Sequence, residues 1–375
     1  MGRSRNAPSK KGIRGKNSET TRSLQKAPPS IPDLLGSAQS LMDQMNFESA
    51  RRFVDRILER DPANSKGREM LGLIEIEDGN IDAARKAFSS LIPPSPTSPS
   101  PPPYSAYLYL AQLTDDDPRE ALAYYQSAVD LLLKETERGN NQPQASEKNE
   151  DVFKLKLTTI SALVGMVEIW MSSDLCFEPE AEQTCDNLVS LAIQSDPDNL
   201  EALECLASVR MSQNKPDDAR SALERAWVLI KDLDPEDPNL PPISTRLSLT
   251  RRFLELSLFS PALVLLQGVI AADDEEMDAW YLQGWCLYLM AMQTQKTGEI
   301  FEDLSREELL QDARDCLDTC LALRGDDGEI MEHVDQLIKE LDAAGIHPSK
   351  KSEEDEDGDE SWESEEEEGS DVEMG

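Results

Sequence analysis

Apolar residues recur at helical spacing along most of this chain, in pairs of runs that short polar turns separate. In residues 200–235 they are Leu203, Leu206, Ala207 and Met211 in the first run, then Ala219, Leu223, Ala226 and Ile230 in the second. Between the runs, Asn214 is suited to the end of one helix and Pro216 to the first turn of the next. The small alanines allow two antiparallel helices to approach closely. The stretch predicts a helix pair whose apolar face needs similar neighbours to be buried.

The spacing of the small residues resembles that of the tetratricopeptide repeat, which has a period of about 34 residues. Counted from Leu200, the alanines at 207, 219 and 226 take the small positions eight, twenty and twenty-seven of that pattern. Repeats that start near Ile31 and Ser65 follow each other in register, with Ala38 and Gly72 at position eight and Gly79 in the turn between the helices of the second repeat. The resemblance implies an all-α fold, a right-handed superhelical solenoid of about seven helix pairs with a capping helix.

The repeat pattern divides the chain into a solenoid and two ends. We expect residues 1–30 to be a disordered basic segment, residues 31–343 to form the solenoid and residues 344–375 to be a disordered acidic tail. Residues 329–343 predict the amphipathic helix that caps the stack. Polar insertions interrupt the repeats at residues 135–150, where we expect a mobile segment, and at residues 293–305.

Residues 93–103 form a proline-rich stretch. Its seven prolines exclude a helix or an inner strand. A stiff surface loop between repeats is the favoured interpretation. Docking to an SH3-like groove through the PxxP spacings is the alternative.

Charge narrows the choice of partner. The formal net charge is −37 at pH 7 and the pI is about 4.3, which argues against nucleic acid as a direct ligand and favours a basic partner. Residues 1–30 carry eight Lys or Arg against one Glu, and their KKGIRGK segment predicts either a nuclear-import signal or a solvated tail. Residues 352–375 carry fourteen Asp or Glu and no base. Without these two ends a charge of −30 stays on residues 31–351, so the predicted solenoid is itself acidic.

Catalytic and metal-binding motifs are missing from the sequence. The six cysteines form no CxxC pair and indicate reduced core residues, although Cys316 and Cys320 share a helix face. His333 and His347 are the only histidines, too few for a metal site. No phosphate loop, nucleophile motif, signal peptide or membrane span is apparent. We expect a soluble intracellular protein that is not an enzyme and needs no cofactor or metal.

The whole pattern resembles one family of chaperones. An acidic solenoid, a basic N-terminal segment, an acidic tail and the opening MGRSRNAPSKKGIRGK are similar to the fungal dedicated assembly chaperones of large-subunit ribosomal protein four. The resemblance implies that the solenoid binds the long basic loop of the newly made ribosomal protein, shields it and escorts it from the cytoplasm to the nucleus. We expect a monomer in a one-to-one complex, with a nuclear import receptor as a candidate further partner and no contact with nucleic acid or membrane.

Side chains on the inner face of the first helices are the candidate partner-binding residues, since carboxylates there can replace phosphates as partners of Lys and Arg. In the folds that this chain resembles, positions two, five, nine, twelve and thirteen of each first helix face the groove. The candidates are Glu69, Glu77, Asp115, Asp116, Glu201, Glu204, Glu255, Asp278, Tyr281, Trp285 and Tyr288. The alternative for each acid is a solvated helix face. The three aromatic residues either stack on Arg and Lys or pack in the core.

Two other functions fit parts of the pattern. A co-chaperone that clamps a C-terminal carboxylate needs Lys, Arg and Asn in its groove, whereas the first repeat offers Leu35 and Gln39 and later repeats are acidic. Charge therefore argues against that function. An acidic scaffold or histone-type chaperone subunit of a nuclear assembly, which would bind through the tail, stays open. Binding by a chain without the tail distinguishes it from a groove.

Overall fold

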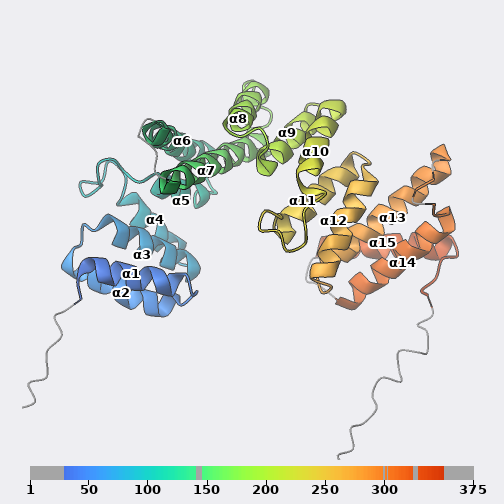
Figure 1. The fold of residues 1–375 in the computed structure, drawn as a ribbon, viewed down its shortest axis with the longest axis horizontal. Helices are drawn as coiled ribbons and strands as arrows, with labels where there is room; N and C mark the ends of the chain where they lie inside the picture. The colour runs from blue at the N-terminus through green and yellow to red at the C-terminus, as the bar shows by residue number, and fades with distance from the viewer. Residues whose placement is uncertain (1–28, 141–145, 299, 302, 324–327, 350–375) are drawn as a thin grey trace, which may run out of the picture. The chain divides into compact units, whose positions relative to one another are not determined.

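The helical character predicted from the sequence is confirmed. The computed structural model describes residues 29–140, 146–298, 300–301, 303–323 and 328–349, and in these ranges it contains fifteen α-helices and no named strand (Figure 1). The helices belong to two compact units, which are residues 1–113 and 114–375. Except for residues 29–30 and 344–349, the two ends expected to be disordered lie outside the described residues.

The first unit contains five helices. They are α1 (Ile31–Met42), α2 (Phe47–Arg60), α3 (Ser65–Glu77), α4 (Ile81–Ser89) and α5 (Tyr104–Gln112). Helix α1 packs on α2, α3 on α4, and α4 on α5. Ser30 begins this unit with a capping box, in which its hydroxyl accepts a bond from Asp33 N and its own N–H donates to the Asp33 carboxylate at 3.0 Å.

The second unit contains the other ten helices. They are α6 (Pro118–Asn140), α7 (Ser146–Met171), α8 (Ala181–Ser195), α9 (Leu200–Ser212), α10 (Pro216–Ile230), α11 (Ile243–Glu255), α12 (Phe259–Ala272), α13 (Met277–Thr297), α14 (Arg306–Leu323) and α15 (Gly328–Ala343). Helix α7 packs on α6, α8 and α9, while α9 pairs with α10, α11 with α12 and α13 with α14.

Four helix pairs share one turn geometry, which confirms the repeat. In each, the second residue before the second helix is left-handed, with φ between 57° and 74°: Met45, Gly79, Asn214 and Ser257. The next residue then donates its N–H to a carbonyl of the first helix at 2.8 Å in all four turns. Such a bond satisfies carbonyls that a helix end leaves without partners. Asn214 and Gly79 were predicted in these turns from sequence, whereas Met45 and Ser257 are not typical turn residues.

The small residues at position eight lie where two helices touch. A Cβ atom on Gly72 of α3 would lie 2.5 Å from the Phe88 ring of α4, and one on Gly284 of α13 would lie 2.8 Å from Leu317 of α14. In the repeat at Leu200, Ala207 is fully buried. Gly165 of α7 is likewise a close contact, where a Cβ atom would lie 2.9 Å from the Tyr125 hydroxyl of the preceding helix α6.

Both polar insertions are more helical than expected. Helix α6 continues to Asn140 and α7 begins at Ser146, so most of residues 135–150 are helical. An ion pair between Lys154 and Glu150, at 2.8 Å and one turn apart, supports this part of α7. Helix α13 likewise extends to Thr297 before the left-handed Gly298 ends it. The Glu, Arg, Lys and Gln residues of these segments are good helix formers, and a helix end does not need an apolar face, so the helices continue into the polar segments.

The proline-rich stretch forms a loop that is fixed by a buried arginine. Arg68 of α3 donates to the carbonyl oxygens of Ser90 at 2.7 Å, Thr97 at 2.8 Å and Ala63 at 2.9 Å. Its guanidinium also reaches the Thr97 hydroxyl at 3.1 Å. The loop between α4 and α5 is thus held against the first unit, as a surface loop between repeats should be.

Five of the six cysteines are buried, as expected of core residues, and Cys176 is exposed. Burial raises the pKa of the thiols of Cys205 and Cys316 to about 12, so both stay protonated at neutral pH. In the described part of the chain, no helix is both long enough and apolar enough to cross a bilayer.

Candidate functional site

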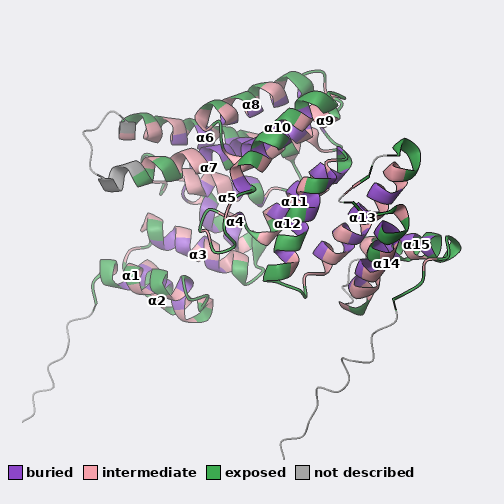
Figure 2. Ribbon diagram, turned by 45° about the vertical axis from the view of Figure 1, so that its right-hand side comes forward, coloured by how far each residue is buried: buried purple, intermediate pink, exposed green. Residues whose placement is uncertain are grey.

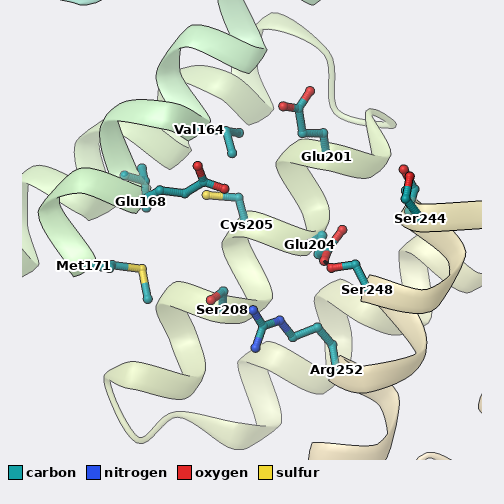
Figure 3. A pocket seen from close by; sticks show the side chains of 12 residues that line it. Val164, Glu168, Met171, Glu201, Glu204, Cys205, Ser208, Ser244, Ser248 and Arg252 are labelled. Atoms are coloured by element: carbon teal, nitrogen blue, oxygen red, sulfur yellow. Dashed lines mark hydrogen bonds between the residues drawn. The ribbon is translucent and has the colours of Figure 1, made fainter. Parts of the chain in front are cut away.

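Three successive first helices of the second unit surround a hollow of about 500 Å³. Its walls are Val164, Val167, Glu168 and Met171 of α7, Glu201, Glu204, Cys205 and Ser208 of α9, and Ser244, Thr245, Ser248 and Arg252 of α11. Figure 3 shows Glu168 extending from α7 toward Cys205, and the Arg252 guanidinium extending from α11 toward Ser208. We call this hollow, defined by these twelve residues, the acidic groove.

Glu204 is the most enclosed carboxylate of the acidic groove. It lies in the middle of α9 and accepts a hydrogen bond from the Ser248 hydroxyl of α11. Burial raises its pKa above the ordinary value of 4.5, and the negative charges of Glu168 and Glu201 add to that rise. The Ser248 bond and the charge of Arg252 act in the opposite direction without cancelling it. A carboxylate in this position lacks part of the water that normally stabilises its charge.

Glu168 and Glu201 complete the cluster. Both residues keep part of their surface in contact with solvent, although the groove walls cover part of the Glu168 carboxyl. Glu201 accepts a hydrogen bond from the Ser161 hydroxyl at 2.7 Å, which fixes its direction from α9. The groove walls desolvate the Glu168 carboxyl and, together with the Glu201 charge, raise its pKa. A ligand cation placed among the three carboxylates would relieve both effects.

Arg252 is the single cation among the described residues that line the acidic groove. Its Nη1 lies 3.1 Å from the Glu255 carboxylate on the same helix. Its Nε is buried and has no hydrogen-bond partner in the described structure. One guanidinium, already shared with Glu255, therefore faces three carboxylates, and the groove keeps a negative charge.

The structure brings only two of the predicted binding residues, Glu201 and Glu204, into this groove. Glu255 lies at the end of α11, where it pairs with Arg252, and Asp278 at the start of α13 pairs with Arg251. In the first unit, Glu69 accepts a hydrogen bond from Ser105, and Glu77 is exposed near the end of α3. These four residues remain candidates for partner binding only because of their positions in the repeat.

Asp115 and Asp116 were counted among the groove-facing positions of a first helix, but they lie in the turn DDDP and not on a helix. Helix α5 ends at Gln112, and both residues lie exposed in the turn that follows. The reason is their neighbour Asp117, whose carboxylate accepts bonds from the N–H groups of Arg119 and Glu120, both at 3.0 Å. Asp117 thereby begins α6, with Pro118 in its first turn.

The three aromatic candidates pack against the capping helix. The Tyr281 hydroxyl lies 2.7 Å from His333 Nδ1 of α15, and the Tyr281 ring stacks on Trp285 at 6.1 Å. Tyr288 donates to Glu340 of α15 at 2.5 Å, and burial together with this bond raises the pKa of Tyr288 to about 12. Of the two interpretations open from sequence, core packing is the one that the structure supports.

Glu168, Ser161, Ser248 and Arg252 were not predicted. Glu168 lies on α7, which is 26 residues long, and at none of the repeat positions taken as groove-facing. Its signal in the sequence is a single carboxylate within the apolar run SALVGMVEIWM. In the described residues, no group of three or more His, Cys, Asp or Glu is arranged to hold a metal ion.

Comparisons with known proteins identify the family. A family model described as tetratricopeptide repeat matches residues 35–99. A protein of Emericella nidulans named "Probable assembly chaperone of rpl4" is 32% identical over 266 residues, which are 69% of this chain and 64% of that protein. A Schizosaccharomyces pombe protein of the same name is 32% identical over 283 residues, 74% of this chain and 80% of that protein. The chain belongs to this family.

A solved structure supports membership in the rpl4 assembly chaperone family. The structure described as "Assembly Chaperone of RpL4 (Acl4) (Residues 1-338)" has a TM-score of 0.64 and 26% identity to this chain. The match covers 72% of this chain and all of that one. The match to the Emericella nidulans protein spans 64% of the length of that protein.

Proposed function

We propose that this protein is a dedicated chaperone of large-subunit ribosomal protein four, and that the acidic groove binds a basic extended loop of the newly made ribosomal protein. The names of its relatives support the partner, and they describe a chaperone and not an enzyme. The observation that supports the acidic groove as the binding site is that Glu168, Glu201 and Glu204 line one hollow together with a single cation, Arg252.

The chemistry of such a loop fits the acidic groove. A segment rich in Lys and Arg, destined to contact RNA, aggregates or binds stray RNA until it is covered. An arginine among these three carboxylates can donate several hydrogen bonds to them. Because the walls exclude part of the water, each pair there counts for more than a pair on an open surface.

The remaining functional details belong to the same proposal. The chaperone shields the loop from aggregation, binds as a monomer in a one-to-one complex and accompanies its cargo from the cytoplasm to the nucleus. The basic segment KKGIRGK supports recognition by an import receptor. Release would follow when the ribosomal RNA, with its denser negative charge, competes for the same Lys and Arg residues.

Charge reversal at matched positions tests the groove. In one variant Glu201 and Glu204 are replaced with Lys. In the control, Glu137 of α6 and Glu224 of α10, both exposed on second helices, are replaced with Lys. The two variants have equal net charge, so bulk attraction for a basic peptide falls equally in both.

Calorimetric titration with the basic loop of the ribosomal protein measures the result. We expect Glu201→Lys/Glu204→Lys to abolish detectable binding and Glu137→Lys/Glu224→Lys to change affinity by less than roughly fivefold, with far-UV circular dichroism unchanged in both. Equal losses in the two variants would show that overall charge and not the acidic groove captures the loop. Full binding by the tail alone would favour the scaffold or histone-type function.

A further inference from the structure

The outer face of α12 is unusual for this protein because it carries no charge. Helix α12 has the sequence FSPALVLLQGVIAA, and every other helix of the second unit contains ionisable acidic or basic residues. Ser260, Val264, Gly268 and Ala272 are all exposed and follow one another at intervals of four. They therefore form one ridge along the helix, in which small side chains leave room for another segment. We call these four residues the α12 face; exposed positions on α12 are green in Figure 2.

A buried arginine without a partner borders the α12 face. Arg246 of α11 is only 6% exposed, its Nε is buried without a hydrogen bond, and among the described residues no acceptor or acid pairs with its guanidinium. The other two buried arginines differ sharply. Arg68 donates to three carbonyl oxygens, and Arg314 binds the carboxylates of Asp318 and Asp342.

The Nε group of Arg246 is costly to bury in this way, because it has lost water and gained no hydrogen bond in exchange. Burial accordingly lowers the pKa of Arg246. The free end of its side chain points to the α12 face: the nearest heavy atom to a Cβ placed on Gly268 would be Arg246 Nη1, at 3.8 Å. The glycine thus leaves open the space through which a carboxylate from outside can reach the guanidinium.

The acidic tail of the same chain begins close to this face. After α15 the chain returns across α14, where the Ser349 hydroxyl donates to Asp315 at 2.7 Å and Gln311 donates to Ser349 at 3.0 Å. Asp315 and Gln267 of α12 line one hollow of about 300 Å³. Gln267 is the neighbour of Gly268 in the chain, so Ser349, near the end of the described chain, is bonded to a residue that shares this hollow with α12.

We propose that the tail, residues 352–375, docks on the α12 face of its own chain, with one of its carboxylates on Arg246. The tail has fourteen acids, and Trp362, Val372 and Met374 lie among them to cover the uncharged ridge. The 26 residues after Ser349 span roughly 85 Å when extended, more than enough to follow one helix. Tethering makes the contact intramolecular and favours it at any protein concentration. A second copy of the chain lacks this tether and is therefore the poorer occupant.

Site-specific photo-cross-linking of the full chain tests this contact. The variant Trp362→p-benzoylphenylalanine is irradiated, and cross-linked peptides are located by mass spectrometry. We expect monomeric products joined to residues 259–272. Val264→Glu, which adds a like charge at a side chain that is 47% exposed, should lower the yield roughly fivefold. Val264→Lys should retain or raise it.

The control pair uses Val228 of α10, which is 64% exposed and lies outside the α12 face. Val228→Glu and Val228→Lys should leave the yield unchanged. Arg246→Gln should lower it as Val264→Glu does, with circular dichroism to verify the fold. Cross-links scattered over many helices, cross-linked dimers, or a yield that Val264→Glu does not change would each overturn the proposal.

Discussion

Gly72 of α3 lies directly against the ring of Phe88 on α4, and a Cβ atom at position 72 would come within 2.5 Å of that ring. Phe88 cannot retreat easily, because it is fully buried and its ring stacks on Tyr109 of α5 at 4.8 Å. The repeat pattern allows Gly or Ala at this position, but here the large partner leaves room for hydrogen alone.

We therefore expect Gly72→Ala to destabilise the protein by about 1–3 kcal/mol, the cost of overpacking a filled core. Gly36→Ala is the control. Gly36 lies inside α1, and a Cβ there would meet nothing within 4 Å, so alanine should stabilise by about 0.5–1 kcal/mol through its helix propensity. Urea denaturation measures both. Changes of the same sign would show that the α3–α4 contact is looser than described.

The acidic groove should cost stability in the absence of a partner. Folding raises the pKa of Glu168 and Glu204 above the ordinary 4.5. At a pH between this ordinary value and the raised folded-state pKa, the folded state therefore binds more protons than the unfolded state. Stability is then lost as the pH rises from 4.5 through the folded-state pKa, and the loss is complete above it. Glu168→Gln and Glu204→Gln should each raise the melting temperature at pH 7.5 and lose this advantage below pH 4.5.

An exposed acid outside the groove provides the comparison for that measurement. Glu224→Gln on α10 removes the same charge at an exposed position outside the acidic groove. Its effect on the melting temperature should be smaller. If Glu224→Gln raised the melting temperature as much as Glu168→Gln and Glu204→Gln do, the destabilisation would come from net charge and not from the acidic groove.

The same two carboxylates predict how partner binding depends on pH. A bound Lys or Arg favours the ionised carboxylates, so binding releases the protons that Glu168 and Glu204 hold in the free protein. Affinity for the basic loop should rise with pH through the raised pKa values and then level off. Calorimetry in two buffers of different ionisation enthalpy counts the released protons. The double variant Glu168→Gln/Glu204→Gln should bind weakly and release none of them, whereas proton release that persists in it would exclude these residues as the source.

Much of the fold could be predicted from the sequence because repeats depend on local rules. Small residues at fixed spacing, such as Ala207 and Ala219, predict where helices touch, and Asn214 and Gly79 predict where the chain turns. Helix ends in polar segments were harder, because residues 135–140 and 293–297 continue a helix without an apolar face and mix good helix formers with poor ones such as Thr and Gly. Nothing local distinguishes such a segment from a loop.

The site was predictable only in part, because it depends on how separate repeats meet. Glu201 and Glu204 lie at standard positions and were found, but Glu168 reaches them through the long helix α7. Asp115 and Asp116 were misplaced because the cap at Asp117 ends the pattern early. The aromatic residues were ambiguous because the sequence does not show which face α15 covers.

Packing of α15 on the aromatic residues leads to a prediction that separates a structural role from a binding role. The Tyr281 hydroxyl bonds to His333 of α15, and Tyr281 is only 8% exposed. Tyr281→Phe keeps the ring and removes this bond, so it should lower the free energy of unfolding by about 0.5–1.5 kcal/mol. Affinity for the basic loop should stay unchanged, because the ring faces the capping helix and not the acidic groove. Thermal denaturation and calorimetry on the same sample give both quantities. If Tyr281→Phe lowered the affinity for the basic loop without changing the stability, Tyr281 would have to contact the partner. That result would imply that α15 moves away when the partner binds.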